Sequence, residues 1–298
     1  MYIEIRKNGK SKKYYLKQSY RVGAKVKKIV KYLGSNLSKE QLNKCSKIAE
    51  KLILEDISGK DILEFELTKD EIKRYQQYDK KIKIEHLQKL NWEHFTEQFT
   101  YNTNAIEGST VSAKEVKELL EQKDKVENLE EVETLNVAKA VSYIKKSKKK
   151  LSVALIKKLH LICFKGTKNF AGKIRKVEVV IRDNLGRVVH VGALAKEVNE
   201  LLDELCIWYE KHNKNYPPSL LATIVHNQFE KIHPFQDGNG RVGRLLLNYI
   251  LLKHKYPPIN IRLKDRSEYY QCLQKYDQNS EIVSMLKFLI KEYRKQYK

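Results

Sequence analysis

The sequence predicts a mainly α-helical protein that begins with a small antiparallel β module and contains one β-hairpin within its helical region. Short strand-like runs separated by glycine turns occupy residues 1–34, whereas apolar residues at helical spacing dominate the rest of the chain. Two β-rich runs around a turn at residues 184–186 form the strong strand signal inside the helical region. The 298 residues suffice for one large or two modest domains.

We expect three parts: a small basic antiparallel β module at 1–36, a helical connector at 37–90, and a helical domain at 91–298. The strands expected in the first part are Tyr2–Arg6, Lys13–Lys17 and Val26–Leu33, with glycine turns between them. Residues 1–34 carry one acidic residue, Glu4, and eleven basic ones, a net charge of +10; the basic residues are Arg6, Lys7, Lys10, Lys12, Lys13, Lys17, Arg21, Lys25, Lys27, Lys28 and Lys31.

Tyrosines alternate with these charges, a pattern that suits the binding of phosphates and the stacking of bases. The same pattern suits a charged edge that prevents strand aggregation or docks on an acidic protein. The formal net charge of the whole chain is +22, which also points towards nucleic acid or acidic surfaces. A composition rich in Lys, Ile, Asn and Tyr is typical of an AT-rich genome, however, so the charge alone leaves these interpretations open.

Two capping boxes mark helix starts in the connector. Ser38 and Gln41 begin a helix expected to run to about Leu54, and Thr68 and Glu71 begin a mostly polar helix that continues towards Leu90. Between these helices, residues 61–67 are expected to form a short extended piece. The four cysteines are far apart and lack zinc spacing, so we expect reduced thiols that pack in the interior: Cys45, Cys163, Cys206 and Cys272.

The stretch from His233 to Arg244, with the sequence HPFQDGNGRVGR, contains the strongest functional signal. Apolar residues at helical spacing precede it from Leu221 to Ile232, and a second helical stripe follows it from Val242 to Ile250. Pro234 cannot continue the first helix, so the motif is predicted to be a helix, a loop and a second helix. The second helix begins near Gly238, where unpaired backbone N–H groups and the positive end of the helix dipole favour an anion.

The residue types in this loop indicate a site for a polyphosphate. The backbone of Gly238, Asn239 and Gly240 can approach phosphate oxygens, and Arg241 and Arg244 lie three residues apart on the first turn of the helix. His233 can accept a proton from a hydroxyl near neutral pH, which is the task of a general base. Asp237 offers a hard oxygen ligand suited to Mg²⁺. Phe235 is expected to point inward and anchor the loop.

This stretch resembles the His-Pro-Phe-x-(Asp/Glu)-Gly-Asn-Gly-Arg-x-x-Arg signature of the Fic family. The resemblance covers about residues 90–290 and implies an α-helical Fic core that transfers AMP from ATP to a hydroxyl group of a protein. It implies that His233 is the base, that Asp237 binds the metal, and that Gly238–Gly240, Arg241 and Arg244 hold the nucleotide. Relatives that act as kinases have Lys where this chain has Gly240, which argues against a kinase.

A second motif lies at the end of a helix predicted from the stripe Leu87, Leu90, Phe95, Phe99 and Ile106. Glu107 is unfavourable at a helix C-terminus because it faces the negative end of the dipole, so it should require a cation. Thr103, Glu107 and Gly108 match the (Ser/Thr)-x-x-x-Glu-(Gly/Asn) signature of the inhibitory helix, here near 91–108, in self-inhibited Fic proteins. This resemblance implies that Glu107 pairs with Arg244 and misaligns ATP.

The expected hairpin lies before the motif helices and resembles the Fic flap, which holds the target by strand-like pairing. The candidate flap residues are Val179, Val180, Ile181, Val188 and Val189, and Gly172 and Arg175 also fit the family pattern. An ordinary surface hairpin is the alternative. His160 is expected to be a hydrogen-bonded core or interface residue and not a catalyst. After Pro258, two closing helices bury Leu286, Leu289, Ile290 and Tyr293.

We therefore expect a self-inhibited protein adenylyltransferase that uses ATP and Mg²⁺ to modify a Ser, Thr or Tyr hydroxyl of a protein, which includes the enzyme itself as a candidate target. Removal of AMP from a modified protein, or transfer of another nucleotide, is the alternative within enzymes. A nucleic-acid-binding regulator with a non-catalytic Fic core is the alternative from another class. No apolar run reaches about 18 residues and the start lacks a signal peptide's apolar stretch, so we expect a cytoplasmic protein without a membrane partner. A homodimer is also expected.

Overall fold

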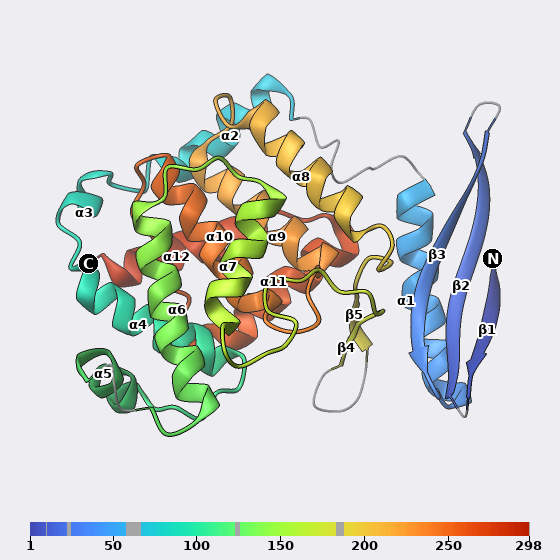
Figure 1. The fold of residues 1–298 in the computed structure, drawn as a ribbon. Coiled ribbons are helices and arrows are strands. Elements are labelled where there is room, and N and C mark those ends of the chain that lie inside the picture. The colour runs from blue at the N-terminus through green and yellow to red at the C-terminus, as the bar shows by residue number, and fades with distance from the viewer. Residues whose placement is uncertain (10, 23–24, 58–66, 123–125, 183–187, 298) are drawn as a thin grey trace.

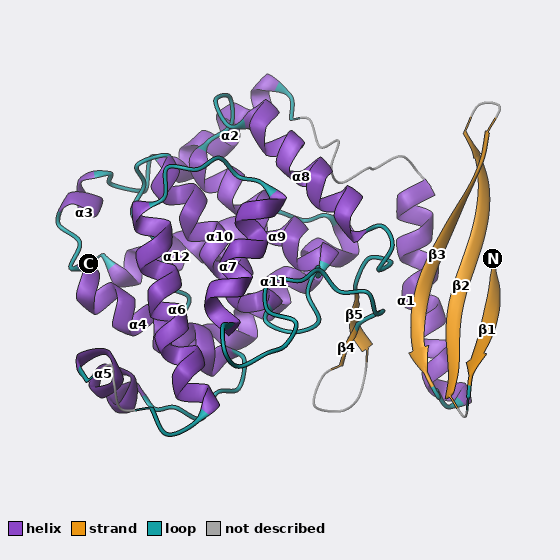
Figure 2. Ribbon diagram, in the orientation of Figure 1, coloured by secondary structure: helices purple, strands orange, loops and turns teal. Residues whose placement is uncertain are grey.

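The computed structural model describes residues 1–9, 11–22, 25–57, 67–122, 126–182 and 188–297. It has a large helical body and a small β module at the N-terminus, with a short hairpin between the two (Figures 1 and 2). Among the described residues, no helix has the length and hydropathy needed to cross a membrane. The predicted fold class, mainly helical with an antiparallel sheet in front, is confirmed.

Two helices form the centre of the helical body: α9 (Pro218–Ile232) and α10 (Asn239–Lys253). The remaining helices of this body are α2 (Lys69–Asp79), α3 (Glu85–Gln88), α4 (Trp92–Ile106), α5 (Ala113–Glu121), α6 (Leu129–Lys146), α7 (Val153–Phe164), α8 (Val198–His212), α11 (Arg266–Asn279) and α12 (Val283–Gln296). Helix α9 packs against α8, α11 and α12, whereas α10 packs against α4, α6 and α7.

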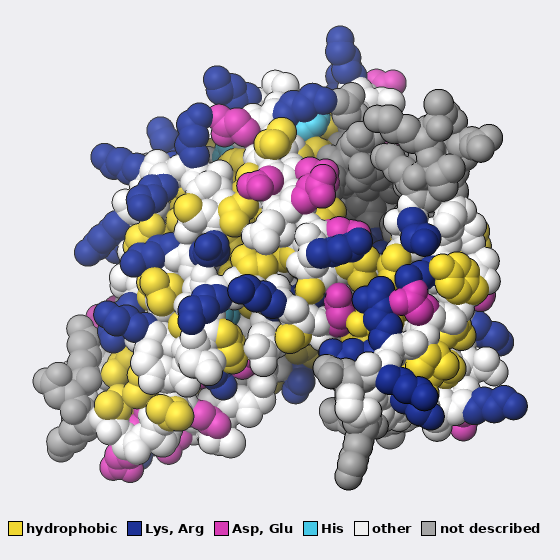
Figure 3. Space-filling model, turned by 45° about the vertical axis from the view of Figure 1, so that its right-hand side comes forward, with side chains coloured by type: hydrophobic (Ala, Val, Ile, Leu, Met, Phe, Trp, Pro, Cys, Tyr) yellow, Lys and Arg dark blue, Asp and Glu magenta, His cyan; other side chains and the backbone are white. Residues whose placement is uncertain are grey.

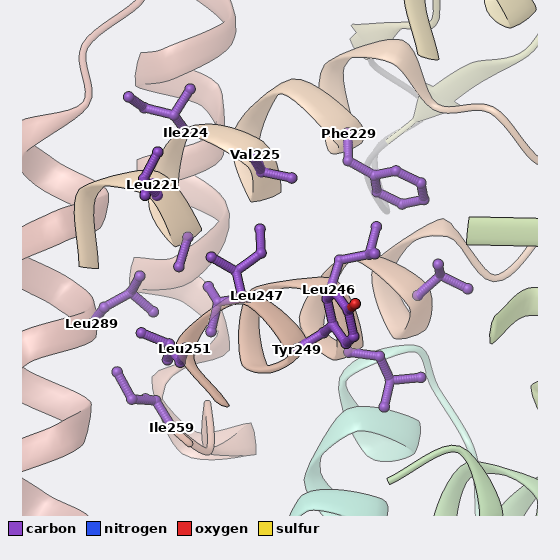
Figure 4. Close-up of a cluster of buried hydrophobic side chains, with 14 of the residues drawn as sticks. Leu221, Ile224, Val225, Phe229, Leu246, Leu247, Tyr249, Leu251, Ile259 and Leu289 are labelled. Carbon is purple, nitrogen blue, oxygen red and sulfur yellow. The ribbon is translucent and has the colours of Figure 1, made fainter. Parts of the chain in front are cut away.

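The apolar faces of α9 and α10 meet in the core (Figure 4). Leu221, Val225 and Phe229 of α9 point towards Leu246 and Leu247 of α10, and all five side chains are completely buried. Both helices are buried around nearly their full circumference, because other helices surround them. The loop between α9 and α10 is therefore held by two rigid elements fixed in the core.

The N-terminal sheet has the strand order β1 (Tyr2–Asn8), β2 (Ser11–Val22) and β3 (Lys25–Ser35), and both pairings are antiparallel. Helix α1 (Lys39–Ile57) follows, and its first turn carries the predicted capping box between Ser38 and Gln41. This helix covers one face of the sheet and forms a small core with it; that core contains Tyr14, Leu16, Leu33, Leu37, Cys45, Ala49 and Ile53. Part of the expected connector thus shares a core with the sheet.

This small core also includes the hairpin formed by β4 (Val180–Arg182) and β5 (Val188–Val191). Val191 is buried in it and Val180 packs on its side. A polar contact joins the N-terminal module to the helical body, since Lys51 of α1 donates a hydrogen bond to Asn279, the last residue of α11 (3.0 Å). The N-terminal module is therefore docked on the hairpin and on the helical body.

Two boundaries in the connector differ from the prediction. The polar helix stops at Asp79 and a single turn, α3, follows it, so the chain is not helical up to Leu90. Helix α4 starts at Trp92, because the side chain of Asn91 accepts a hydrogen bond from the N–H of His94 and caps the helix there. The extended piece expected at 61–67 falls mostly outside the described residues.

Lys and Arg side chains are spread over the face in Figure 3, on the helical body as well as on the N-terminal module. A positive charge that covers both parts does not single out the module as a nucleic-acid site. All four cysteines are free thiols, as expected; Cys45, Cys163 and Cys272 are buried and Cys206 is half-buried.

Candidate active site

His233 ends helix α9 in the left-handed conformation (φ 53°), and its backbone N–H closes the helix on the carbonyl of Phe229. Its side chain is half-buried, and its Nδ1 lies 3.3 Å from the carbonyl oxygen of Glu230. A carbonyl only accepts hydrogen bonds, so this contact places the proton of the neutral ring on Nδ1. The lone pair is then on Nε2, where it can accept a proton from a substrate.

The loop after His233 is closed by Asn239. Its side-chain oxygen accepts from the N–H of Phe235 and its side-chain nitrogen donates to the carbonyl of Phe235, both at 2.8 Å. Phe235 is completely buried and stacks on His160 at 3.8 Å. His160 accepts from the N–H of Gly172 at Nδ1, so its Nε2 donates to the carbonyl of Asp237 at 3.0 Å. These contacts hold the loop in one conformation.

Gly238 precedes helix α10 with a positive φ of 82°. A Cβ at this position would overlap the ring of Phe164, so both the backbone conformation and the space require glycine. No side chain caps this helix end in the described part of the chain. The first N–H groups of α10 thus point out of the helix without a capping partner, which is the geometry of an anion site.

Arg244 lies on the second turn of α10 and is 1% exposed. Its Nε donates to the hydroxyl of Thr103 (2.7 Å), and its Nη2 donates to the carbonyl of Thr103 (2.9 Å) and to Oε1 of Glu107 (2.8 Å). Burial opposes the charge of Arg244, but Glu107, Tyr269 and Tyr270 together outweigh burial and raise the pKa of this guanidinium. Its Nη1 is buried and has no hydrogen-bond partner among the described residues.

Glu107 is the C-cap of α4, and Gly108 follows it with a φ of 93°, as expected for a helix end. The carboxylate of Glu107 lies against Gly240: a Cβ at position 240 would overlap Oε1 of Glu107 and would lie 3.0 Å from Nη1 of Arg244. A negative group of this same chain therefore occupies the space beside the open end of α10.

Arg241 points to a different helix. Its Nη1 donates to Oε2 of Glu133 on α6 (2.5 Å), and its guanidinium lies over the ring of Phe164 at 4.3 Å. The half-exposed Asp237 lies 3.8 Å from Arg241 Nη2 and 3.5 Å from Lys168 Nζ. Among the described residues, no cluster of three or more His, Cys, Asp or Glu side chains could hold a metal ion alone. Asp237 could contribute one ligand to an ion that binds chiefly to phosphates.

The hairpin lies beside His233 because Arg175 connects the two. Arg175 is buried; its Nε donates to the carbonyl of His233 (2.7 Å), its Nη1 to the carbonyl of Val177 (2.8 Å), and its Nη2 to that of Ala193. The side chain thereby links the end of α9 with both sides of the hairpin. Nη2 also donates to the carbonyl of Ile232 (3.3 Å), so one planar group satisfies four backbone carbonyls, which a lysine cannot do with the same geometry.

Burial sets the protonation of the central groups. It lowers the pKa of His233 to about 3, and His190 and Arg175 act in the same direction, so the ring is neutral at physiological pH. Burial raises the pKa of Glu230 to about 8; Arg244 opposes this shift and Glu107 adds to it. A neutral imidazole beside an open helix end and buried guanidinium groups can deprotonate a hydroxyl while an anion is held nearby.

Both the sequence and the fold of this region are similar to those of known proteins. Residues 150–251, which contain the hairpin, the loop and most of α10, match the Fic/DOC family. By this match, residues 150–251 form a Fic/DOC family domain. Over 185 residues it is 31% identical to a protein adenylyltransferase Fic from Nematostella vectensis, an alignment that covers 59% of this chain and 42% of that protein. A Caenorhabditis elegans relative, protein adenylyltransferase fic-1, is 30% identical, with 59% and 35% covered. The alignments thus span less than half of the length of these relatives.

The fold agrees with solved Fic structures. A Fic domain-containing signaling protein from Bacteroides thetaiotaomicron superimposes with a TM-score of 0.64, 24% sequence identity, and coverage of 76% of this chain and 93% of that one. Fic-1 from C. elegans gives a TM-score of 0.61 with 23% identity and covers 88% of this chain and 76% of that one. These matches extend well beyond the 102 residues of the family match to most of the helical body.

Within this Fic/DOC domain the structure brings together most of the predicted site residues. His233, Asp237, Gly238, Gly240 and both arginines line one region, and Thr103 and Glu107 reach it from α4 although they lie more than 100 residues earlier. Asn239 lies there too, but both side-chain amide atoms bond to Phe235. The functional roles of these residues stay predictions.

The flap prediction is only partly covered by the structure. The backbone of the hairpin is antiparallel, with Val180 opposite Val191 and Ile181 opposite His190. The expected turn at 184–186 and the side chains of Ile181, Val188 and Val189 lie outside the described residues. His160 is confirmed as a buried, hydrogen-bonded residue, and burial lowers its pKa to about 4. Three charged residues near the site were not predicted, because no local pattern distinguishes them from other charged residues: Glu133, Lys168 and Asp277.

Proposed function

We propose that this protein is a self-inhibited protein adenylyltransferase that transfers AMP from ATP to a Ser, Thr or Tyr hydroxyl of a protein target. The observation that carries the proposal is the position of Glu107. Its carboxylate pairs with Arg244 and lies against Gly240 at the open end of α10, where the geometry favours a phosphate. In this proposal Glu107 holds the arginine that would otherwise bind the outer phosphate of ATP.

The chemistry assigns a task to each residue. His233 accepts the proton of the target hydroxyl at Nε2, the hydroxyl oxygen forms a bond to the α-phosphorus, and the bond from that phosphorus to pyrophosphate breaks. The N–H groups at the start of α10 would bind phosphate oxygens, and so would Nη1 of Arg244, which no described residue contacts through a hydrogen bond. With Glu107 in place, the outer phosphate cannot reach Arg244, so the α-phosphorus is misaligned for in-line attack.

The donor set also fits Mg²⁺. Asp237 is half-exposed, and its carboxylate oxygens are hard ligands. Magnesium is commonly held by one or two carboxylates together with the phosphates of its substrate. We propose that Asp237 holds this ion, which would neutralise phosphate charge while the nucleotide is bound. Lys168 and Arg241, which neighbour Asp237, would then turn towards phosphate oxygens.

We also propose that the N-terminal module takes part in recruiting the target. It shares a core with the hairpin beside His233, so a protein held by the hairpin would meet the module as well. Its net positive charge favours an acidic protein surface. A nucleic acid is the second candidate partner, and salt-dependent DNA or RNA binding by the full chain would support it.

The test compares the wild type, Glu107→Gly and Glu107→Gly/His233→Ala, each incubated with Mg²⁺ and ATP labelled on the α-phosphate. We expect strong labelling of the chain or of added lysate proteins only with Glu107→Gly. The labelling should exceed that of the wild type by roughly 100-fold, because a misplaced reactant lowers the rate by about that factor. Glu93→Gly, which removes an exposed glutamate from the same helix, should behave like the wild type.

The other functions predict different results. If Glu107→Gly binds ATP but labels nothing, the transferase proposal is wrong. Release of AMP from an adenylylated protein by the wild type, lost in Glu107→Gly, would indicate AMP removal. Labelling with GTP, CTP or UTP in place of ATP would indicate transfer of another nucleotide.

A further inference from the structure

His190 lies on β5 of the hairpin, and its two ring nitrogens both face acceptors. Nδ1 is 3.0 Å from Oδ2 of Asp277 on α11, and Nε2 is 3.1 Å from the carbonyl oxygen of Lys231 on α9. A carboxylate and a carbonyl cannot donate hydrogen bonds. Both contacts are therefore hydrogen bonds only when both nitrogens of His190 carry protons, as in the imidazolium ion.

Asp277 is the partner that such a cation requires. Its side chain is only 13% exposed. Burial raises the pKa of this carboxyl, but the charges of His190, Lys231 and Lys31 outweigh burial, and the net shift is downward. Lys231 comes from α9 and Lys31 from β3 of the N-terminal module, so Asp277 attracts charges from three parts of the fold.

The same histidine lies beside the candidate base. The rings of His190 and His233 are 5.7 Å apart, and the charge of His190 lowers the pKa of His233. The neighbouring backbone is also tied to the end of α9, since the N–H of Ala193 donates to the carbonyl of Ile232 (3.3 Å). The N–H of Gly192 donates to the carbonyl of Val179 (3.3 Å) and joins the two sides of the hairpin. A Cβ at Gly192 would lie 3.3 Å from the Cβ of His233.

We infer that His190 is a positioning residue: held between Asp277 and the carbonyl of Lys231, it fixes strand β5 relative to His233. This inference rests on the proposed function in one respect, namely that the hairpin presents the target to His233. Side-chain and backbone contacts at His190 and Ala193 join β5 to the body, and in the described part of the chain the sheet that contains β5 has β4 as its second and last strand. Loss of the His190 contacts should release the strand while the nucleotide residues on α10 stay in place.

The groups that face His190 carry charges of both signs, and Asp277 of α11 is the negative one. The others are Lys231 and His233 from α9, Lys31 from β3, and Arg175 next to His233. Asp277→Asn should therefore weaken the imidazolium form, since four neighbouring groups are cationic or neutral. Lys31→Gln should have a smaller effect in the opposite direction, because it removes a charge that competes for Asp277.

The first experiment is direct observation of the ring. In ¹⁵N-histidine spectra of the wild-type chain near pH 6, both nitrogens of His190, assigned by their loss in His190→Gln, should show the shifts of protonated nitrogen. In Asp277→Asn one nitrogen should shift to an unprotonated value at the same pH. A wild-type ring with one unprotonated nitrogen at pH 6 would overturn the inference without any variant having to fold.

The second experiment measures how firmly the backbone next to strand β5 is held. Hydrogen exchange of the Gly192 and Ala193 amides should be at least about tenfold faster in His190→Gln and Asp277→Asn than in the wild type. His254→Gln, which changes a histidine at the far end of α10, and Asp203→Asn, which changes an exposed aspartate on α8, are the matched controls. Unchanged exchange in both His190→Gln and Asp277→Asn would contradict a positioning role.

The third experiment separates positioning from nucleotide binding. Added to Glu107→Gly, His190→Gln should lower AMP labelling by roughly tenfold or more, while the Kd for ATP stays within about twofold. An equal loss of ATP affinity would assign His190 to the nucleotide site instead. If Glu107→Gly itself does not label, the proposed function fails, whereas the spectra and the exchange rates still decide the inference about His190.

Discussion

The carboxylate of Glu107 occupies the space into which a side chain at position 240 would project. Glu107 and Gly240 are more than 130 residues apart in the sequence, yet the same small volume at the start of α10 can hold either the carboxylate or a side chain at position 240. The absence of a side chain at Gly240 is what allows the carboxylate of α4 to reach Arg244. If Glu107 marks the position of a phosphate, Gly240 is also what allows a phosphate to approach the helix end.

Gly240→Ala tests this relationship in the Glu107→Gly background. With no carboxylate to collide with, the alanine Cβ needs only a shift of a few tenths of an ångström by Nη1 of Arg244, which lies 3.0 Å away. The substitution should then stabilise the protein by up to about 1 kcal/mol, as the higher helix propensity of alanine predicts. The added methyl group should nevertheless weaken ATP binding by roughly tenfold or more, since it fills the space of the phosphate. Isothermal titration calorimetry with ATP and a thermal melt measure the two effects separately.

Gly243→Ala in the same background is the contrasting control. A Cβ there would overlap the buried carboxyl of Glu230, so this variant should lower the melting temperature. ATP affinity that does not change in Gly240→Ala would mean that phosphate binds elsewhere on the helix end.

Thr103 is the second residue of α4 that holds Arg244. Thr103→Val removes the hydroxyl that accepts from Nε at 2.7 Å and leaves a buried charged donor without its partner. We expect a loss of about 1–3 kcal/mol in the free energy of unfolding. Labelling by the otherwise wild-type chain should rise, but less than in Glu107→Gly, because the contacts to Glu107 and to the carbonyl of Thr103 persist.

Thr96→Val is the matched control for that variant. Thr96 lies two turns earlier on α4 and donates its hydroxyl to the carbonyl of Trp92 (2.7 Å), so its removal leaves no buried charge unpaired. Its melting temperature should change little, and its labelling should equal that of the wild type. Equal effects of the two substitutions would show that Thr103 contributes to helix α4 and not to the restraint of Arg244.

Local patterns predicted the parts of the site that are local in sequence. The loop from His233 to Arg244, the helix end at Glu107 and the hairpin each depend on residues a few positions apart, whose spacing sets their geometry. The contacts between these parts were not accessible in that way. Arg175 reaches Ala193 and His233, Glu133 reaches Arg241, and Asp277 reaches His190, over separations of 18 to 108 residues.

Helix boundaries failed for a different physical reason. The apolar stripe begins at Leu87 and Leu90, before the first residue of α4, and only the cap formed by Asn91 shows where α4 begins. Similarly, the capping box at Ser38 located the start of α1, but no periodicity shows that this helix packs on the N-terminal sheet and reaches the hairpin. Capping is encoded locally, whereas packing partners depend on the fold.

Two completely buried histidines make the stability of the fold sensitive to acid. Burial lowers the pKa of His160 to about 4 and that of His226 to about 3, whereas an exposed histidine titrates near 6.5. Below pH 6.5 the unfolded chain binds protons that the folded chain does not bind, so the free energy of unfolding falls as the pH falls. For His226 this loss amounts to about 1.4 kcal/mol per pH unit and continues down to about pH 3.

His226→Gln isolates this effect, because an amide can replace the contact with the hydroxyl of Tyr269 (2.9 Å) but does not titrate. Glu230 acts in the opposite direction: its raised pKa makes the folded state less stable as the pH rises above 4.5, and this contribution is present in both proteins. As the pH falls from 6.5 to 5, the difference in the free energy of unfolding between His226→Gln and the wild type should therefore grow in favour of the variant, by about 1.4 kcal/mol per pH unit.

Urea unfolding at several pH values measures this difference, with His94→Gln, at an exposed position of α4, as the control. A difference that is independent of pH would mean that His226 binds its proton in the folded state as readily as in the unfolded chain.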